Sequence, residues 1–296
     1  MTRQEFETLT AQGIVYLDGA TGSNLYLAGM PHGICTEAWV LEHPQVLAQL
    51  QKKYVEAGSQ IVYAPTFGGN RFSLEGRGLE NQIGDMNKRL VEISKKAVGD
   101  RALIAGDVAP IGKMLESRGG DTTVDELFEV YREQITYLSE AGVDLLVAET
   151  MMSLEEAMVA LDAASTVCDL PVMCSLSFEA DGNAIFGGSA VEAVETLQAM
   201  GAVAVGLNCS VGPDQLETIV RNMKAVAEVP VIAKPNAGLP FIDDHGNATY
   251  SMGPEEFAKY LKVLVEAGAS IVGGCCGTTP DYIRKVKLAL EGKLIG

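Results

Sequence analysis

Short apolar runs recur along the chain, and several of them follow a helix-like segment that ends in glycine. Gly58 precedes the run 61–64, Gly142 precedes the run 145–148, and Gly268 precedes Ile271 and Val272. A glycine at such a place fits the left-handed residue that closes a helix. The pattern therefore predicts a repeated unit of helix, turn and strand. The expected strands cover 14–17, 61–64, 102–105, 145–148, 171–176, 203–206, 229–233 and 271–272.

Amphipathic stretches such as 124–139 and 254–266 separate these runs and are typical of helices with one buried face. Near-continuous Val, Ile and Leu runs favour strands that are covered on both faces, as in a parallel sheet. Eight such units in 296 residues match the number and length of a (β/α)₈ TIM barrel. We therefore predict an α/β chain with a single domain, residues 1–296. A doubly wound open sheet is the alternative.

The composition favours a globular protein with a large core and disfavours a protein that binds nucleic acid or membranes. Hydrophobic residues make up 47% of the chain and charged residues 21%, which is enough to bury a large core. A formal charge of -17 disfavours binding to nucleic acid or to an anionic membrane. The N-terminal residues 1–7 are polar, and no apolar segment approaches the roughly 20 residues that span a bilayer. We expect a cytoplasmic protein with small-molecule or protein partners.

Loop lengths are unequal, and the long loops share one position in the expected units. Links from helix to strand are short, whereas several links from strand to helix are long. In a barrel these long links lie together at the carboxyl ends of the strands, where active sites of such enzymes are found. We expect the functional site on that face. The long links are 21–43, 68–82, 110–122, 179–188 and 238–253.

Three cysteines stand at the ends of expected strands. Cys209 follows the sixth strand, and Cys275 and Cys276 follow the eighth. Only one strand separates the sixth from the eighth in a barrel, so their ends can converge on one ion. Three thiolates favour Zn²⁺ and leave one of its four positions open. The alternatives are three separate buried cysteines, or a strained disulfide between the adjacent pair.

Adjacent residues of a regular strand point to opposite faces. Cys275 and Cys276 can therefore share a metal only if the backbone leaves strand geometry there. Gly273, Gly274 and Gly277 permit that departure.

The sequence resembles the homocysteine S-methyltransferase family over essentially its whole length. The resemblance rests on four motifs at or near the ends of expected strands. They are Asp-Gly-Ala-Thr-Gly at 18–22, Gly-Leu-Asn-Cys-Ser at 206–210, Lys-Pro-Asn-Ala-Gly-Leu-Pro at 234–240 and Gly-Gly-Cys-Cys-Gly-Thr-Thr-Pro at 273–280.

The resemblance implies a (β/α)₈ barrel that binds zinc through Cys209, Cys275 and Cys276 and binds the thiolate of homocysteine for methylation to methionine. Glu149 resembles the carboxylate that receives the amino group of homocysteine. Asp18 matches a second acidic position of the family, and Asp107 ends the third strand in the same manner.

Three further residues of the matching motifs are expected at the substrate: Gly19, Asn208 and Asn236. Asn236 lies between the two cysteine-bearing strands. We hypothesise that its amide oxygen occupies the open zinc position when no substrate is bound.

The methyl donor is expected to be cobalamin-based. The residues of the motifs at 235–240 and 275–280 are most similar to those in the first barrel of cobalamin-dependent methionine synthase. That enzyme continues into folate, cobalamin and activation modules, whereas this sequence stops at Gly296. We therefore expect a donor in trans, either a corrinoid protein or methylcobalamin. The alternative donors are S-methylmethionine, S-adenosylmethionine and betaine.

Other chemistries remain open at this point. Lys234, at the end of the seventh strand, would form a Schiff base in a barrel lyase if its pKa were lowered. The glycines at 273, 274 and 277 would cradle a phosphate beside the following helix. A subunit that only holds homocysteine or a corrinoid protein would need the same cysteines.

Overall fold

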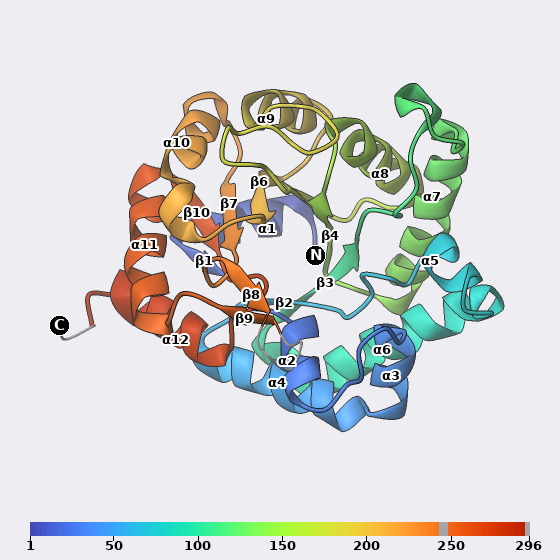
Figure 1. Ribbon diagram of the computed structural model, residues 1–296, viewed down its shortest axis with the longest axis horizontal. Coiled ribbons are helices and arrows are strands. Elements are labelled where there is room, and N and C mark those ends of the chain that lie inside the picture. Colours follow the sequence, from blue (N-terminus) through green and yellow to red (C-terminus); the bar gives the residue numbers. More distant parts are fainter. Residues whose placement is uncertain (243–247, 294–296) are drawn as a thin grey trace.

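The computed structural model describes residues 1–242 and 248–293. Eight parallel strands form one sheet in the order β1-β10-β7-β6-β5-β4-β3-β2, and a bridge between Leu17 and Ile61 closes it into a barrel (Figure 1). The predicted (β/α)₈ barrel is confirmed. Its strands are β1 (Val15–Tyr16), β2 (Ile61–Tyr63), β3 (Leu103–Val108), β4 (Leu145–Met151), β5 (Val172–Leu176), β6 (Ala204–Cys209), β7 (Val231–Pro235) and β10 (Ala269–Val272).

The helices surround the barrel as an outer ring (Figure 1). The expected helices at 124–139 and 254–266 are observed as α7 and α11, each slightly longer at its C-terminus. The link 21–43, expected as a loop, contains two short helices, α2 and α3. The helices are α1 (Arg3–Thr10), α2 (Gly22–Leu27), α3 (Thr36–Glu42), α4 (Pro44–Ala57), α5 (Arg71–Glu75), α6 (Ile83–Val98), α7 (Val124–Ala141), α8 (Leu154–Val167), α9 (Ala190–Ala199), α10 (Glu217–Val226), α11 (Pro254–Ala267) and α12 (Pro280–Leu290).

Local sequence explains where α7 begins and ends. Thr123 precedes the helix and accepts a hydrogen bond from Glu126 N, while the Glu126 side chain accepts one from Thr123 N. This reciprocal capping satisfies two amide groups that the first turn leaves unpaired. Gly142 closes the helix at φ 75°, and Gly58 closes α4 at φ 115°. Both glycines have the positive φ predicted from the sequence.

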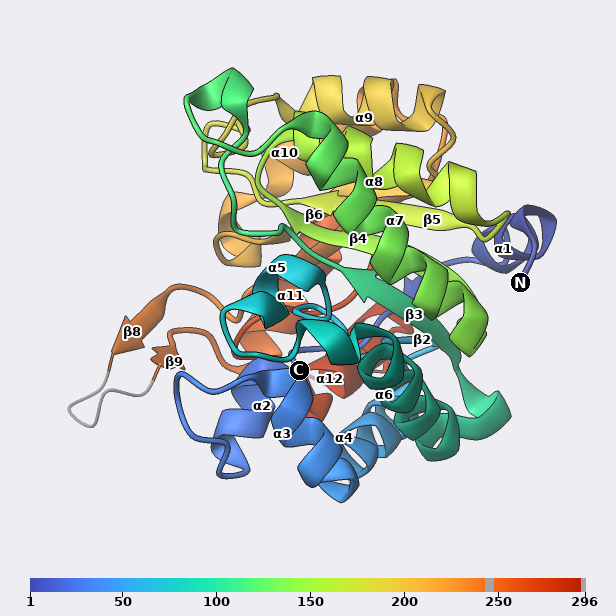
Figure 2. The same ribbon diagram turned by 90° about the vertical axis from the view of Figure 1, so that its right-hand side faces the viewer.

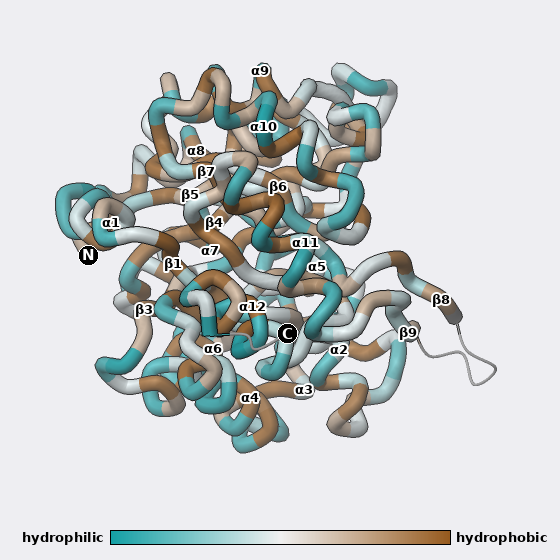
Figure 3. The backbone as a smooth tube through the Cα atoms, turned by 90° about the vertical axis from the view of Figure 1, so that its left-hand side faces the viewer, coloured by the Kyte–Doolittle hydropathy of each residue, from teal (hydrophilic) through white to brown (hydrophobic). Residues whose placement is uncertain are grey.

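The apolar core has two layers, one inside the barrel and one between strands and helices. Side chains alternate between the layers along each strand, so Leu145 and Val147 point inward while Leu146 and Ala148 face the helices. Phe6 of α1 packs against the inward cluster and covers the end of the barrel at the amino ends of the strands. Strands β5, β6 and β7 form mostly hydrophobic stretches in Figure 3.

A small antiparallel hairpin interrupts the link between β7 and α11. Its strands are β8 (Pro240–Ile242) and β9 (Ala248–Tyr250), and Pro240 pairs with Tyr250. The predicted loop 238–253 thus contains strands, and its residues 243–247 lie outside the described part. Figure 2 shows the hairpin projecting from the body on the side away from α1. Within 1–242 and 248–293, no helix is both long and apolar enough to cross a membrane.

Candidate metal and substrate site

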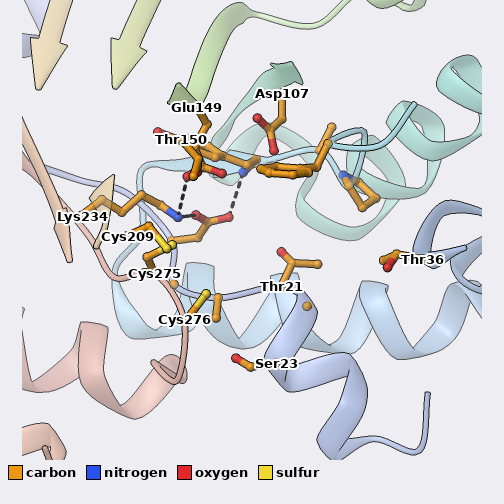
Figure 4. Close-up of a pocket in the computed structure, with 18 of the residues that line it drawn as sticks. Thr21, Ser23, Thr36, Asp107, Glu149, Thr150, Cys209, Lys234, Cys275 and Cys276 are labelled. Carbon is orange, nitrogen blue, oxygen red and sulfur yellow. Dashed lines mark hydrogen bonds and ion pairs between the residues drawn. The ribbon is translucent and has the colours of Figure 1, made fainter. Parts of the chain in front are cut away.

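A cavity of about 280 Å³ opens at the carboxyl ends of the strands, on the face predicted from the loop lengths. Its wall combines thiols, carboxyl groups and one lysine, which come from strands far apart in the sequence (Figure 4). The lining residues that carry chemistry are Asp18, Tyr63, Asp107, Glu149, Thr150, Cys209, Lys234, Cys275 and Cys276.

The three cysteines meet at one side of this cavity. Their sulfur atoms all lie within 4.8 Å of one another. β10 ends at Val272, so Cys275 and Cys276 lie in a turn and not in the strand, as predicted. Cys275 N donates to Pro235 O at 2.7 Å, and Cys276 O accepts from Ala237 N at 2.9 Å. These bonds hold the turn against the end of β7.

Two glycines let the turn pass close to its neighbours. A Cβ atom on Gly273 would lie 2.7 Å from Asp18 O, which real side chains do not tolerate. Gly277 has φ 81°, and a Cβ there would overlap the ring of Tyr250 on β9. Cys209 also has a positive φ, 58°, although it is not a glycine. Such a conformation costs about 1–3 kcal/mol and is typical of functional sites.

The cysteine cluster fits a zinc ion. With Zn–S bonds of about 2.3 Å, a tetrahedral site places its sulfurs roughly 3.8 Å apart, within the observed spacing. Hydrogen bonds from the Cys209 and Cys275 thiols lower the pKa of Cys276 to about 3, so the cluster already favours a thiolate. All six cysteines are described and are free thiols, which removes the alternative of a Cys275–Cys276 disulfide.

A buried charge cluster lies beside the thiols. Lys234 Nζ is 3.2 Å from Glu149 Oε1 (Figure 4) and 3.6 Å from Asp18 Oδ1. The other Asp18 oxygen accepts a hydrogen bond from Tyr63 N at 2.8 Å. Lys234 Nζ also lies 4.7 Å from the centre of the Tyr63 ring. Lys234 on β7 therefore bridges two carboxyl groups, one that follows β1 and one on β4.

Burial and ion pairing have opposite effects on the pKa values of these three groups. Burial raises the pKa of Asp18 to about 7, although Lys234 lowers it. Burial likewise raises the pKa of Glu149. For Lys234 burial lowers the pKa, but Glu149 and Asp18 outweigh it and hold the pKa well above the usual range. An amine kept charged in this way is a poor nucleophile, which argues against the Schiff-base lyase.

Two predicted substrate residues, Asn208 and Asn236, are buried but do not line the cavity. Asn208 Nδ2 donates to Thr150 Oγ1 at 2.6 Å and lies 3.9 Å from Cys275 Sγ. Its Oδ1 accepts from Thr150 N at 2.9 Å. Asn236 Nδ2 donates to Ser210 O at 3.3 Å, whereas its Oδ1 has no partner among the described residues.

The other predicted site residues, namely Asp18, Gly19, Glu149 and the three cysteines, do line the cavity.

Tyr63 and Glu37 are among the cavity wall residues that were not predicted as site residues. Tyr63 points inward, as Ile61 does, and this alternation along β2 was a signal that could have found it. Glu37 lies in α3 and accepts a hydrogen bond from Gly68 N at 2.7 Å, joining two loops of the cavity rim. Nothing in the sequence of the long link 21–43 marks Glu37 as a wall residue.

Comparison with known proteins relates the whole barrel to one family. The sequence pattern of the family described as Homocysteine S-methyltransferase matches residues 15–290. The chain is 31% identical to methionine synthase of Mycobacterium leprae and 30% identical to methionine synthase of Mycobacterium tuberculosis, over 96% and 95% of its own length. It spans 25% of the length of each of these relatives.

The fold is similar to that of a solved enzyme. The metallated form of the homocysteine methyltransferase MmuM from Escherichia coli superposes with a TM-score of 0.80 at 24% identity, covering 95% of this chain and 98% of that one. The oxidized form of the same enzyme gives 0.79. At this level of identity the likeness shows a shared barrel.

Proposed function

The chain belongs to the homocysteine S-methyltransferase family, and from this premise we propose that it transfers a methyl group to the thiol of homocysteine, giving methionine. The observation that carries the proposal is the placement of three cysteine sulfurs, within 4.8 Å of one another, in the wall of a cavity lined by carboxyl groups. The same cavity thus offers a thiol-binding metal site and partners for an amino group. We take the barrel, residues 1–296, as the homocysteine-binding unit.

In this proposal Cys209, Cys275 and Cys276 hold Zn²⁺, in keeping with the metallated form of the similar MmuM enzyme. Bound zinc would supply a Lewis acid that keeps a substrate thiol deprotonated near neutral pH, with one position open for it. Asn208 supports the cluster from behind, since its amide is close to Cys275 and is fixed by Thr150.

The charged groups position the substrate. Glu149 and Asp18 face the cavity, and a charge-assisted hydrogen bond donated by the amino group of homocysteine to one of them would orient that group. Lys234 favours the ionised form of both carboxyl groups through its ion pairs and offsets part of the effect of burial on their pKa values. Gly19 lets the backbone border the cavity, because a Cβ there would lie 2.6 Å from Tyr54 Oη. Fixing the amino acid at both ends aligns its sulfur for attack on a methyl carbon.

Asn236 has a separate role in the proposal. Its Oδ1 is buried and has no hydrogen-bond partner in the described part of the chain, which supports the hypothesis that this oxygen takes the open metal position when substrate is absent.

For the donor, we propose a corrinoid protein or methylcobalamin acting in trans. The resemblance of the motifs at 235–240 and 275–280 to cobalamin-dependent methionine synthase supports this choice over a small-molecule donor, and two methionine synthases are among the relatives. The open face of the barrel is compatible with a large donor, since Phe67 lines the cavity and is 44% exposed. S-methylmethionine, S-adenosylmethionine and betaine are the alternatives.

A donor panel tests the proposal. Zinc-loaded protein is given homocysteine with methylcobalamin, S-methylmethionine, S-adenosylmethionine or betaine in turn, and methionine is measured. We expect methionine from methylcobalamin, and loss of about one zinc per chain together with activity in Cys209→Ala. Cys168→Ala, at the end of α8 and away from the cavity, is the matched control.

Full activity of zinc-free Cys209→Ala would contradict the mechanism. Homocysteine binding without methionine from any donor would favour a subunit that only holds its ligand.

A further inference from the structure

Asp107 is a buried carboxyl group whose hydrogen-bonding needs are not met inside the protein. It lies on β3 in the cavity wall and is 4% exposed. Its Oδ1 atom has no hydrogen-bond partner among the described residues. A polar atom left in this state costs about 1–3 kcal/mol. Buried polar atoms without partners are rare in proteins, so this one requires an explanation.

The position of the carboxyl group is fixed by the backbone. Thr66 Oγ1 accepts a hydrogen bond from Asp107 N at 3.1 Å and donates one to Asp107 O at 2.8 Å. The backbone of Asp107 is therefore held in place. Among the described residues, no cation forms an ion pair with its side chain.

Glu149 stands beside Asp107 on the neighbouring strand β4. The register pairs Asp107 with Val147, and Glu149 follows two residues farther toward the mouth on the same inward face. Figure 4 shows both carboxyl groups at the cavity. Lys234 forms ion pairs with Glu149 and Asp18, but in the described residues no lysine or arginine pairs with Asp107. Among the described residues the cavity wall thus has four carboxyl groups, those of Asp18, Glu37, Asp107 and Glu149, and one lysine, Lys234.

We propose that Asp107 is a specificity-determining residue that binds the α-ammonium group of homocysteine together with Glu149. The inference rests on the proposed function and assigns the amino group to a place between β3 and β4. An ammonium group has three donors and no acceptor, so it can serve two carboxylates at once. Burial, with a contribution from Glu149, raises the pKa of Asp107 well above its usual range. A bound ammonium group would offset this cost of ionising Asp107.

In this arrangement Asp18 keeps its ion pair with Lys234 and does not bind the ammonium group. Its second oxygen is already taken by Tyr63 N, so Asp18 has less capacity for a ligand than Asp107 has. A neutral donor such as water would fill the hydrogen-bonding gap at Asp107 but would leave the excess negative charge. The proposal therefore predicts discrimination between ligands that differ only in the amino group.

Calorimetric titration of zinc-loaded protein tests this prediction. The two probes are L-homocysteine and 4-sulfanylbutanoate, which has the same thiol and carboxylate but no amino group. Asp107→Asn should weaken homocysteine binding about 10- to 100-fold, the usual effect of one hydrogen bond between charged groups. Binding of 4-sulfanylbutanoate should stay within about threefold of the wild type. Asp162→Asn, exposed on α8, is the matched control and should change neither value.

The melting temperature separates this role from a structural one. Asp107→Asn should keep or raise the melting temperature, because it removes a buried carboxyl group whose Oδ1 has no hydrogen-bond partner within 1–242 and 248–293. A lower melting temperature with equal weakening for both probes would overturn the inference, as would unchanged homocysteine binding. If the wild-type protein binds neither probe, the proposed function itself fails, and this outcome is distinct from the others.

Discussion

Replacing Lys234 with methionine should expose the mutual dependence of the buried charges. The lysine is 4% exposed and lies 3.2 Å from Glu149 and 3.6 Å from Asp18. At an effective dielectric constant of about 20, each pair is attractive by roughly 5 kcal/mol. Much of this attraction offsets the cost of burying the charges. Removing one partner of a buried pair costs about 3–5 kcal/mol, which is the loss of unfolding free energy that we expect for Lys234→Met at pH 8.

The loss should shrink in acid. Burial raises the pKa of Asp18 to about 7 and also raises that of Glu149, so both groups take up protons as the pH falls. A protonated carboxyl group is neutral, so removing the lysine leaves no unpaired buried charge on it. The cost of Lys234→Met should therefore be full above pH 7 and fall by about half or more at pH 5.

Urea unfolding at pH 8 and pH 5, followed by circular dichroism and by the fluorescence of Trp39, measures the loss of unfolding free energy at each pH. The matched control is Lys285→Met, since Lys285 lies 2.8 Å from Glu255 but both side chains are partly exposed. An exposed pair contributes less than about 1 kcal/mol. A loss in Lys234→Met as small as that of the control, or equal at the two pH values, would show that Lys234 does not stabilise two buried ionised carboxyl groups.

Three further predictions concern the surroundings of the cavity. Asn208→Ala removes the amide near Cys275 and should weaken zinc binding about 10- to 100-fold, measured by competition with a chelator; unchanged affinity would show that Asn208 does not support the cluster. Asp18 has its pKa raised from 3.8 to about 7, so its stabilising contribution is full below pH 4 and lost as the pH rises through 7. Asp18→Asn should therefore gain melting temperature relative to the wild type across that window, and a constant difference would contradict the pKa shift. Gly277→Ala should cost about 1–3 kcal/mol because of its positive φ and the overlap with the Tyr250 ring. Thermal unfolding measures this cost, and adding Tyr250→Ala should restore part of it.

The barrel was predictable because each unit has its own local signals. Gly58 and Gly142 mark helix ends, and the apolar runs after them are long enough to identify strands. The hairpin β8–β9 was not predicted, since its strands have three residues each and lie in a loop. Helices α2 and α3 were missed for the same reason. Such short elements depend on contacts with the barrel more than on their own sequence.

The cysteine cluster was predictable from strand ends, but the charge cluster was only partly so. Asp18, Glu149 and Lys234 each stood out as single residues. Their pairing depends on which side chains point inward, and this follows from register and strand length. The positive φ of Cys209 and Thr150 had no signal either, because neither residue type favours that conformation.

The proposed site has three cysteines that hold a zinc ion with one position open to the thiol of homocysteine. X-ray absorption at the zinc edge, before and after adding homocysteine, tests it most directly. We expect three sulfur neighbours at about 2.3 Å in the resting protein and four after homocysteine is added. A sulfur count that homocysteine leaves unchanged would show that its thiol does not bind the zinc ion.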